Sequence, residues 1–389
     1  MSEIEQNSEL EELQTQTEDE EEDDDDSLPE QFKMSVVSTN LSIEFLVKLY
    51  KEREIYIPEF QRGYVWKLKQ ASRLIESLLL GFPVPPLFLA KEEDQRMIVI
   101  DGNQRLQSIV YFYENRFKKS KCFNLKGVID KYNGKRFDQL EAPDQRRFKN
   151  YPFPVIIIEP KEEKDRQGIY YIFERLNTGG TNLKPQEIRA CIYHGALNEL
   201  IVELDENEEK WREIFYGEKK EKQRETKKKE EQEKIPIETK ETNGQEMILR
   251  FLAIYYDNKG KKEYKGYDLK QFLNQWMAKN RNPSEEKKNE MRNIFTSTIN
   301  VIYKSVGKDA FKRIDKRDKK FIPAYFESIM VAVAERVEAG GEIRNTDGLI
   351  KKYKELVDTY QKEEILKERK TEKFRKMLEM AREAFKDIE

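Results

Sequence analysis

A short strand–turn–helix junction places the strongest constraint on how this chain folds. The apolar run 98–100 (Ile-Val-Ile) predicts a buried strand, Asp101-Gly102 predicts a tight turn, and the residues after them have the spacing of an amphipathic helix. A helix start presents unpaired backbone N–H groups and the positive end of the helix dipole, which suits an anion. Arg105 falls in the first helical turn, where its planar guanidinium can bind a phosphate. The junction therefore predicts an anion-binding corner, with a capped helix and a solvated Arg105 as the alternative.

A second Gln-Arg pair, Gln61-Arg62, lies upstream in a short extended segment between aromatic residues. The apolar spacing over 68–80 predicts a helix that the following glycine ends, and the run 87–89 predicts another strand. Polar residues over 91–96 then predict a hairpin that leads into the strand at 98–100. Because each Gln-Arg pair lies beside the end of an element, the two pairs could converge on one anionic ligand.

Downstream, the run 151–159 predicts a buried strand and the residues over 166–176 predict a helix. Asn177-Thr178-Gly179 follow this helix, where they form either a phosphate-binding nest or a simple reversal of the chain. Pro185 suits the first turn of a further helix that extends to about Leu204. From the residues alone, both interpretations of the turn stay open.

Four segments of the chain, in order, resemble the N-terminal domain of GmrSD-type restriction endonucleases: IPEFQRGYVW, LIESLLLGFPVPPLFLA, IVIDGNQRLQSIVYF and FERLNTGGTNLKPQEIRA. The resemblance covers roughly residues 40–200, about half of the chain. It implies a small α+β domain of the ParB/sulfiredoxin-like superfamily that binds a nucleoside triphosphate with Mg²⁺. In several relatives, nucleotide hydrolysis is coupled to restriction of modified DNA in phage defence.

The family's signature loop is usually Asp-Gly-Gln-Gln-Arg, and Asn103 departs from it by a side chain that is one methylene shorter. This departure preserves the amide and puts the geometry of hydrolysis in doubt. The resemblance implies three catalytic candidates, which are Asp101, Gln104 and Arg105. It also implies a set of nucleotide-binding candidates, which are Gln61, Arg62, Gly102, Asn103, Asn177, Thr178 and Gly179.

The resemblance implies a division of roles among these residues. Arg62 and Arg105 would hold phosphates while the backbone of the turn cradles one of them. Gln61 and Gln104 would orient the ligand or a water molecule. Asp101 would accept a proton from that water or help to hold Mg²⁺; its alternative role is only to cap the following helix. Asn177 and Thr178 would close the pocket from the opposite side.

The chain contains one histidine, His194, and two cysteines, Cys122 and Cys191. An HNH metal site cannot be assembled from one histidine, so the chain is not expected to be an HNH nuclease by itself. His194 is expected to cap a helix or to pack. The cysteines give neither a disulfide framework nor zinc spacing, and no signal peptide or membrane-spanning run is visible. We therefore expect a cytoplasmic protein without membrane contact and without a bound structural metal.

Charge divides the chain unevenly. Residues 1–30 contain 15 Asp or Glu and no Lys or Arg, whereas the remainder has 72 basic and 60 acidic residues. The acidic segment predicts disorder and either a solubilising tail or an internal DNA mimic. The expected organisation is an acidic tail at 1–33, a ParB/sulfiredoxin-like domain at 34–205, a charged linker at 206–244 and an all-helical domain at 245–389.

Helical periodicity recurs through the second half, over 247–256, 269–277, 291–306, 321–337, 349–360 and 374–388. A basic cluster in this half supplies candidates for contact with the DNA backbone, although such clusters are often only solvated: Lys312, Arg313, Lys316 and Arg317. No motif in this half names a function.

Two functions follow from the sequence. The first is a subunit of a DNA-targeting defence system that binds a nucleoside triphosphate, with hydrolysis left open, so that its partners are nucleotide, DNA and a separate nuclease. The second is a DNA-binding or adaptor protein without catalysis that keeps the fold and recruits a nuclease from another chain. Whether the chain is an enzyme therefore stays open.

Overall fold

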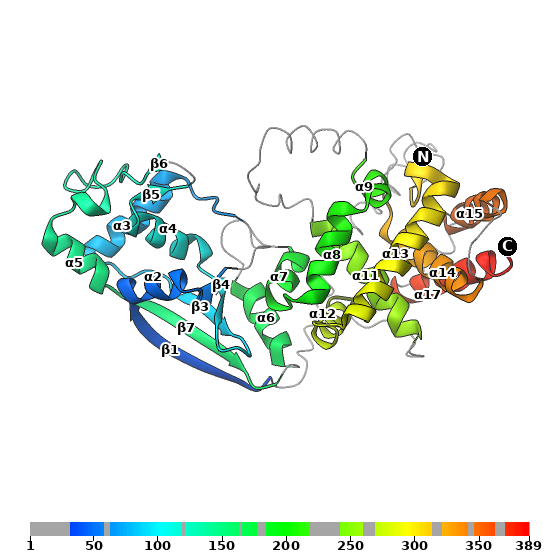
Figure 1. Cartoon of the computed structure of the whole chain (residues 1–389), viewed down its shortest axis with the longest axis horizontal. Helices are drawn as coiled ribbons and strands as arrows, with labels where there is room; N and C mark the ends of the chain where they lie inside the picture. The colour runs from blue at the N-terminus through cyan, green and yellow to red at the C-terminus, as the bar shows by residue number, and fades with distance from the viewer. Residues whose placement is uncertain are drawn as a thin grey trace, which may run out of the picture. The chain divides into compact units, whose positions relative to one another are not determined.

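The computed structural model describes residues 32–57, 63–118, 121–162, 165–176, 184–217, 242–259, 269–312, 321–340, 346–361 and 370–388. Residues 33–389 form one compact unit. Within it, strands and helices come first along the chain, and every described element after residue 165 is a helix (Figure 1). An α+β region followed by a helical region confirms the predicted fold class.

A five-stranded sheet organises the N-terminal region (Figure 1). Its spatial order is β1 (Met34–Ser42), β7 (Pro152–Pro160), β3 (Leu87–Lys91), β4 (Met97–Asp101) and β2 (Ile55–Tyr56). Strand β1 pairs antiparallel with β7, and β3 pairs antiparallel with β4. In contrast, β3 pairs parallel with β7, and β2 pairs parallel with β4. This order places β3 and β4, which flank the candidate site, in the interior of the sheet.

Four helices cover one face of the sheet: α2 (Ile43–Lys51), α3 (Leu68–Leu80), α4 (Asn103–Tyr113) and α5 (Ala142–Asn150). Leu87, Leu89 and Val99 point into this layer, whereas their strand neighbours Ile98 and Ile100 point to the opposite face. Because both faces are covered, the strands are apolar without alternation, as in other sheets that are buried on both sides. A small second sheet pairs β5 (Arg116–Phe117) with β6 (Lys121–Cys122) next to α4.

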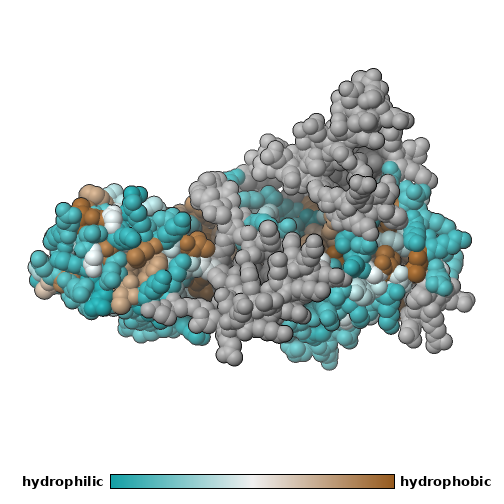
Figure 2. All heavy atoms as spheres, turned by 90° about the horizontal axis from the view of Figure 1, so that it is seen from above, coloured by the Kyte–Doolittle hydropathy of each residue, from teal (hydrophilic) through white to brown (hydrophobic). Residues whose placement is uncertain are grey.

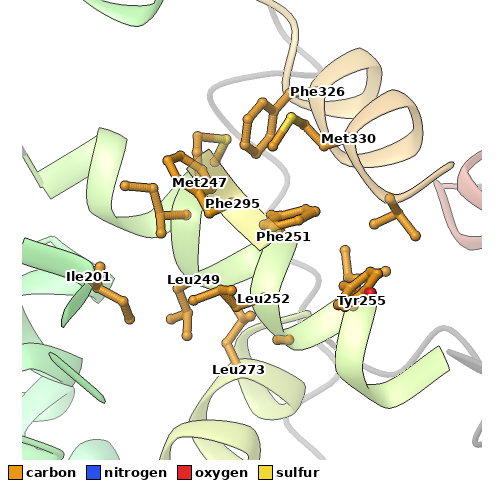
Figure 3. Packing of buried hydrophobic residues seen from close by; sticks show 14 of the residues in the cluster. Ile201, Met247, Leu249, Phe251, Leu252, Tyr255, Leu273, Phe295, Phe326 and Met330 are labelled. Atoms are coloured by element: carbon orange, nitrogen blue, oxygen red, sulfur yellow. The ribbon is translucent and has the colours of Figure 1, made fainter. Parts of the chain in front are cut away.

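The opposite face of the sheet belongs to a hydrophobic core that continues through the helical region. In Figure 3, Phe251, Phe295, Phe326 and Met330 lie toward one another in this core. The helices that build it are α6 (Arg166–Leu176), α7 (Pro185–Ile192), α8 (Ala196–Asn207), α9 (Glu209–Phe215), α11 (Thr242–Lys259), α12 (Leu269–Lys279), α13 (Glu285–Val306), α14 (Pro323–Gly340), α15 (Thr346–Tyr360) and α17 (Lys370–Phe385). Helices on both sides of the undescribed residues 218–241 therefore share one core.

Most helices and strands predicted from periodicity are confirmed, including α3 and its glycine cap Gly81, which has φ +76°. The single helix predicted from Pro185 to about Leu204 is wrong. The chain breaks into α7 and α8 at Tyr193–Gly195, where Gly195 has φ +152°. Residues of the α12–α13 turn occupy this break, because a Cβ on Gly195 would lie 2.5 Å from Asn282 Oδ1. A tertiary contact therefore overrides a continuous helical pattern.

Among the helices within the described ranges, none is both long and apolar enough to cross a membrane.

Candidate functional site

The β4–α4 corner is built around Gly102. Strand β4 ends at Asp101, Gly102 takes the left-handed conformation with φ +96°, and α4 begins at Asn103 without a side-chain cap. A Cβ on Gly102 would lie 2.3 Å from Leu87 Cδ2 and 3.1 Å from Arg105 Nη2. Both the backbone angle and the lack of space therefore require glycine here. The helix start consequently presents its backbone beside a guanidinium group.

Arg105 is held in place against this corner. Its Nη2 donates to Asp101 Oδ2 at 2.6 Å and to the Pro86 carbonyl oxygen at 3.0 Å. Its side chain is 17% exposed and that of Asp101 is 42% exposed. Within the described part of the chain, Arg105 Nε is buried without a hydrogen-bond partner. Asp101 thus orients the guanidinium, whose donor groups are only partly used in these bonds.

Gln104 joins the corner to the segment 63–66. Its Oε1 accepts from the backbone N–H groups of Val65 at 2.9 Å and Trp66 at 3.1 Å, and its Nε2 donates to the Gly63 carbonyl oxygen at 3.2 Å. These bonds fix the chain directly after Gln61-Arg62. Gln104 therefore attaches segment 63–66 to the corner, while its predicted role in orienting a ligand or water stays a prediction.

Tyr64 strengthens this attachment. Its hydroxyl lies 2.8 Å from Ser108 Oγ, and its ring packs edge-on against Tyr111 and Phe117. Burial raises the pKa of Tyr64 to about 12, and the hydrogen bond with Ser108 only partly opposes this effect. Segment 63–66 is thus bound to α4 by both polar and aromatic contacts.

Replacing Gln104 with alanine is expected to loosen segment 63–66, because all three hydrogen bonds to its backbone are lost. The amide N–H groups of Val65 and Trp66 should exchange with solvent about tenfold faster, equivalent to one or two net hydrogen bonds. Hydrogen exchange measured by NMR tests this. The control is Gln107→Ala, since Gln107 bonds Asn103 and Tyr111 instead. Equal exchange rates in the two variants would contradict the role of Gln104.

Several predicted site residues fall outside the described residues: Gln61, Arg62, Asn177, Thr178, Gly179, Arg313, Lys316 and Arg317. The described Lys312 has a 14% exposed side chain, donates to the Lys308 carbonyl oxygen and pairs with Asp309 at 3.7 Å. Asn103 Oδ1 accepts from Gln107 Nε2. The structure thus brings together Asp101, Gly102, Asn103, Gln104 and Arg105 at one corner.

A buried ionic junction lies at the turn between β3 and β4, at the end of the hairpin away from the β4–α4 corner. No sequence motif predicts it. Glu92 accepts from Arg166 Nη1 at 3.0 Å and from Arg281 Nη2 at 2.7 Å. Burial would raise the pKa of Glu92, but the two guanidinium groups outweigh burial and hold it below its usual value. Arg281 Nε also donates to the His194 carbonyl oxygen at 2.7 Å. The partners are far apart in sequence, so spacing could not reveal them.

His194 lies in this junction as a packing residue. Its Nε2 is 2.9 Å from the Tyr56 hydroxyl, and burial lowers its pKa. Tyr193, not His194, is the C-cap of α7. The His194 ring packs in this junction, and it also contacts the backbone of Cys191 in the last turn of α7.

Comparison with known families places the corner within a defined domain. Residues 43–194 match the family model described as the GmrSD restriction endonuclease, N-terminal domain. A comparison with curated proteins gave no match.

Proposed function

Because residues 43–194 carry a GmrSD restriction endonuclease N-terminal domain, which points to a component of a restriction or phage-defence system, we propose that this chain binds a nucleoside triphosphate at the β4–α4 corner. In this proposal the chain is the nucleotide-binding component of a DNA-targeting system. A separate nuclease subunit completes the system.

The observation that carries the proposal is the position of Arg105 beside the backbone of Gly102. A phosphate that approaches the start of α4 would meet backbone N–H groups and a guanidinium held by Asp101. Because Gly102 has no side chain, the Arg105 guanidinium lies directly against the backbone of the turn. The residues present therefore fit a phosphate group, and Arg105 would hold it.

The remaining residues would act around this contact. Gln104 holds the segment that follows Arg62, which supports placing the second arginine at the same phosphates. Asp101, with an exposed carboxylate, would help to hold Mg²⁺ or accept a proton from water. Asn177 and Thr178 would close the site. When bound, the nucleotide supplies a phosphoanhydride bond. Whether this chain hydrolyses that bond is tested by measuring phosphate release, as described below.

The alternative is an adaptor that binds DNA and recruits a nuclease without catalysis. Its supporting observation is the pairing of Asp101 with Arg105 at 2.6 Å, which engages an oxygen of the only carboxylate proposed as the base. Binding of nucleotide without turnover would fit a nucleotide-controlled adaptor.

Arg105→Ala is expected to weaken nucleotide binding by at least about tenfold, because a charge-assisted hydrogen bond contributes about 1.5–3 kcal/mol. Binding and phosphate release are measured for each of the four nucleoside triphosphates with Mg²⁺, with and without DNA. Arg73→Ala is the control, since Arg73 is an exposed arginine of α3 in the same domain. Equal effects of the two substitutions, or no nucleotide binding by the wild type, would reject the site.

A further inference from the structure

The β5–β6 hairpin and the loop after it carry a dense positive charge that the nucleotide site does not use. Residues 115–136 contain eight Lys or Arg and a single acidic residue, Asp130. Three of these cations are paired: Arg116 with Glu114, Lys131 with Asp144, and Arg136 with Asp138. All three carboxylates belong to residues outside 115–136, so the positive charge of the segment is not balanced from within it.

Of the other five cations, Lys119 lies outside the described residues, and four lysines lack a carboxylate partner within the described ranges: Lys118, Lys121, Lys126 and Lys135. Three of them are exposed and Lys135 is half-buried. In the view of Figure 2, the region that holds these elements shows mostly hydrophilic residues around a few hydrophobic ones. Unpaired ammonium groups gathered in this way produce a positive potential at the surface.

The backbone that carries these lysines is fixed. Phe117 and Phe123 pack edge-on against each other, and Phe123 packs in the same way against Phe112 of α4. The loop after β6 is tied to α3, because the Lys126 N–H donates to Ser72 Oγ at 3.0 Å and the Ile129 N–H donates to Glu76 Oε1 at 2.7 Å. The positive charges are therefore presented by an ordered surface.

This surface adjoins the segment held by Gln104. Lys118 Nζ lies 5.8 Å from the ring centroid of Tyr64, whose hydroxyl contacts Ser108 of α4. A polyanion lying along the hairpin would therefore pass beside the segment that borders the candidate nucleotide corner.

We propose that the basic hairpin surface, formed by Arg116, Lys118, Lys121, Lys126, Lys135 and Arg136, binds the phosphate backbone of duplex DNA. The identity of the partner rests on the proposed function, since a DNA-targeting component needs a DNA contact. Lysines suit this role because they act as point charges that need no defined base sequence. The acidic segment 1–30 of this chain is also a polyanion. Binding of that segment to the basic hairpin surface is the alternative outcome that the experiment below distinguishes.

The test reverses three charges in the full chain: Lys118→Glu, Lys121→Glu and Lys126→Glu together. Binding to a 30-base-pair duplex is followed by fluorescence anisotropy over a range of salt concentrations. At about 0.1 M salt the affinity should fall at least tenfold. The slope of log affinity against log salt should shrink by about 2–3, because each lost phosphate contact removes about 0.9.

The matched control carries the same charge change on exposed lysines of α12 and α15: Lys279→Glu, Lys351→Glu and Lys354→Glu. It should keep most of the wild-type affinity, and equal losses in both triple variants would overturn the proposal. The acidic segment is the occupant if two results are found together. The amides over 116–136 are protected in the full chain without DNA and lose this protection in the hairpin variant, and the wild type does not bind the duplex. That outcome would also overturn the proposal.

Nucleotide binding without DNA is measured in the same variants, so that the two proposals fail separately. If DNA binding is lost only in the hairpin variant and no variant binds nucleotide, the proposed DNA surface is supported and the proposed nucleotide site is rejected. Nucleotide binding that depends on Arg105, with DNA affinity unchanged by the hairpin substitutions, would reject the surface alone.

Discussion

Replacing Glu92 with alanine is expected to lower the free energy of unfolding by about 3–5 kcal/mol, because it leaves two buried guanidinium groups without their carboxylate. Glu92 is 7% exposed, and it binds Arg166 with one oxygen and Arg281 with the other. Denaturant unfolding followed by circular dichroism measures the loss. The residue joins the end of β3, the start of α6 and the α12–α13 turn, so its removal breaks contacts among three parts of the fold.

The control for this experiment is Glu93→Ala. Glu93 is the next residue in the same hairpin, has the same charge and is exposed. Its removal should change the free energy of unfolding by less than about 0.5 kcal/mol. Similar losses in both variants would mean that Glu92 is not the buried centre of the junction.

The effect should also depend on pH in one direction. The two arginines hold the pKa of Glu92 below its usual value. Its ionic contribution is therefore fully present above the pKa of the unfolded chain, about 4.3, and is lost as the pH falls through the lower folded value. The difference in stability between the wild type and Glu92→Ala should accordingly narrow below about pH 4.

Replacing Gly102 with alanine is expected to destabilise the chain by about 2–5 kcal/mol. The left-handed backbone costs a residue with a Cβ about 1–2 kcal/mol, and overpacking adds about 1–3 kcal/mol. The new methyl group would collide with Leu87 Cδ2 and press on the Arg105 guanidinium. Nucleotide binding should fall with it, because Arg105 could no longer lie against the turn. Thermal unfolding and nucleotide titration measure both effects.

Gly81→Ala distinguishes the cost of the left-handed backbone from the cost of the steric clash at Gly102. Gly81 has φ +76° at the end of α3, and nothing lies within 4 Å of the position that its Cβ would take. This substitution should show only the backbone penalty and should leave nucleotide binding intact. If it costs as much as Gly102→Ala, the close contact at the corner contributes nothing.

Local patterns predicted the elements around the corner because their causes are local. The apolar strand, the Asp-Gly turn and the position of Arg105 in the first turn of α4 all follow from neighbouring residues. Packing on both faces of the sheet also leaves a visible mark, since an apolar run without alternation indicates a strand that is buried on both sides.

Long-range partners were not visible from the same patterns. Gln104 was interpreted as a group that orients ligand or water, yet its described bonds go to the backbone of residues 63–66. The Glu92 junction joins residues 74 and 189 positions apart, which no spacing rule covers. The break between α7 and α8 likewise depends on Asn282 from a distant turn.

The core that runs from the sheet into the helices has a practical consequence for dissecting this molecule. The sequence-matched domain, residues 43–194, contains Ile98, Ile100 and Ile158, whose core continues into α8, α11 and α14. It also contains Glu92 but not Arg281. A fragment that ends at residue 194 would therefore expose to solvent the apolar sheet face that packs on these helices. It would also keep Glu92 and Arg166 without Arg281, the other partner of Glu92.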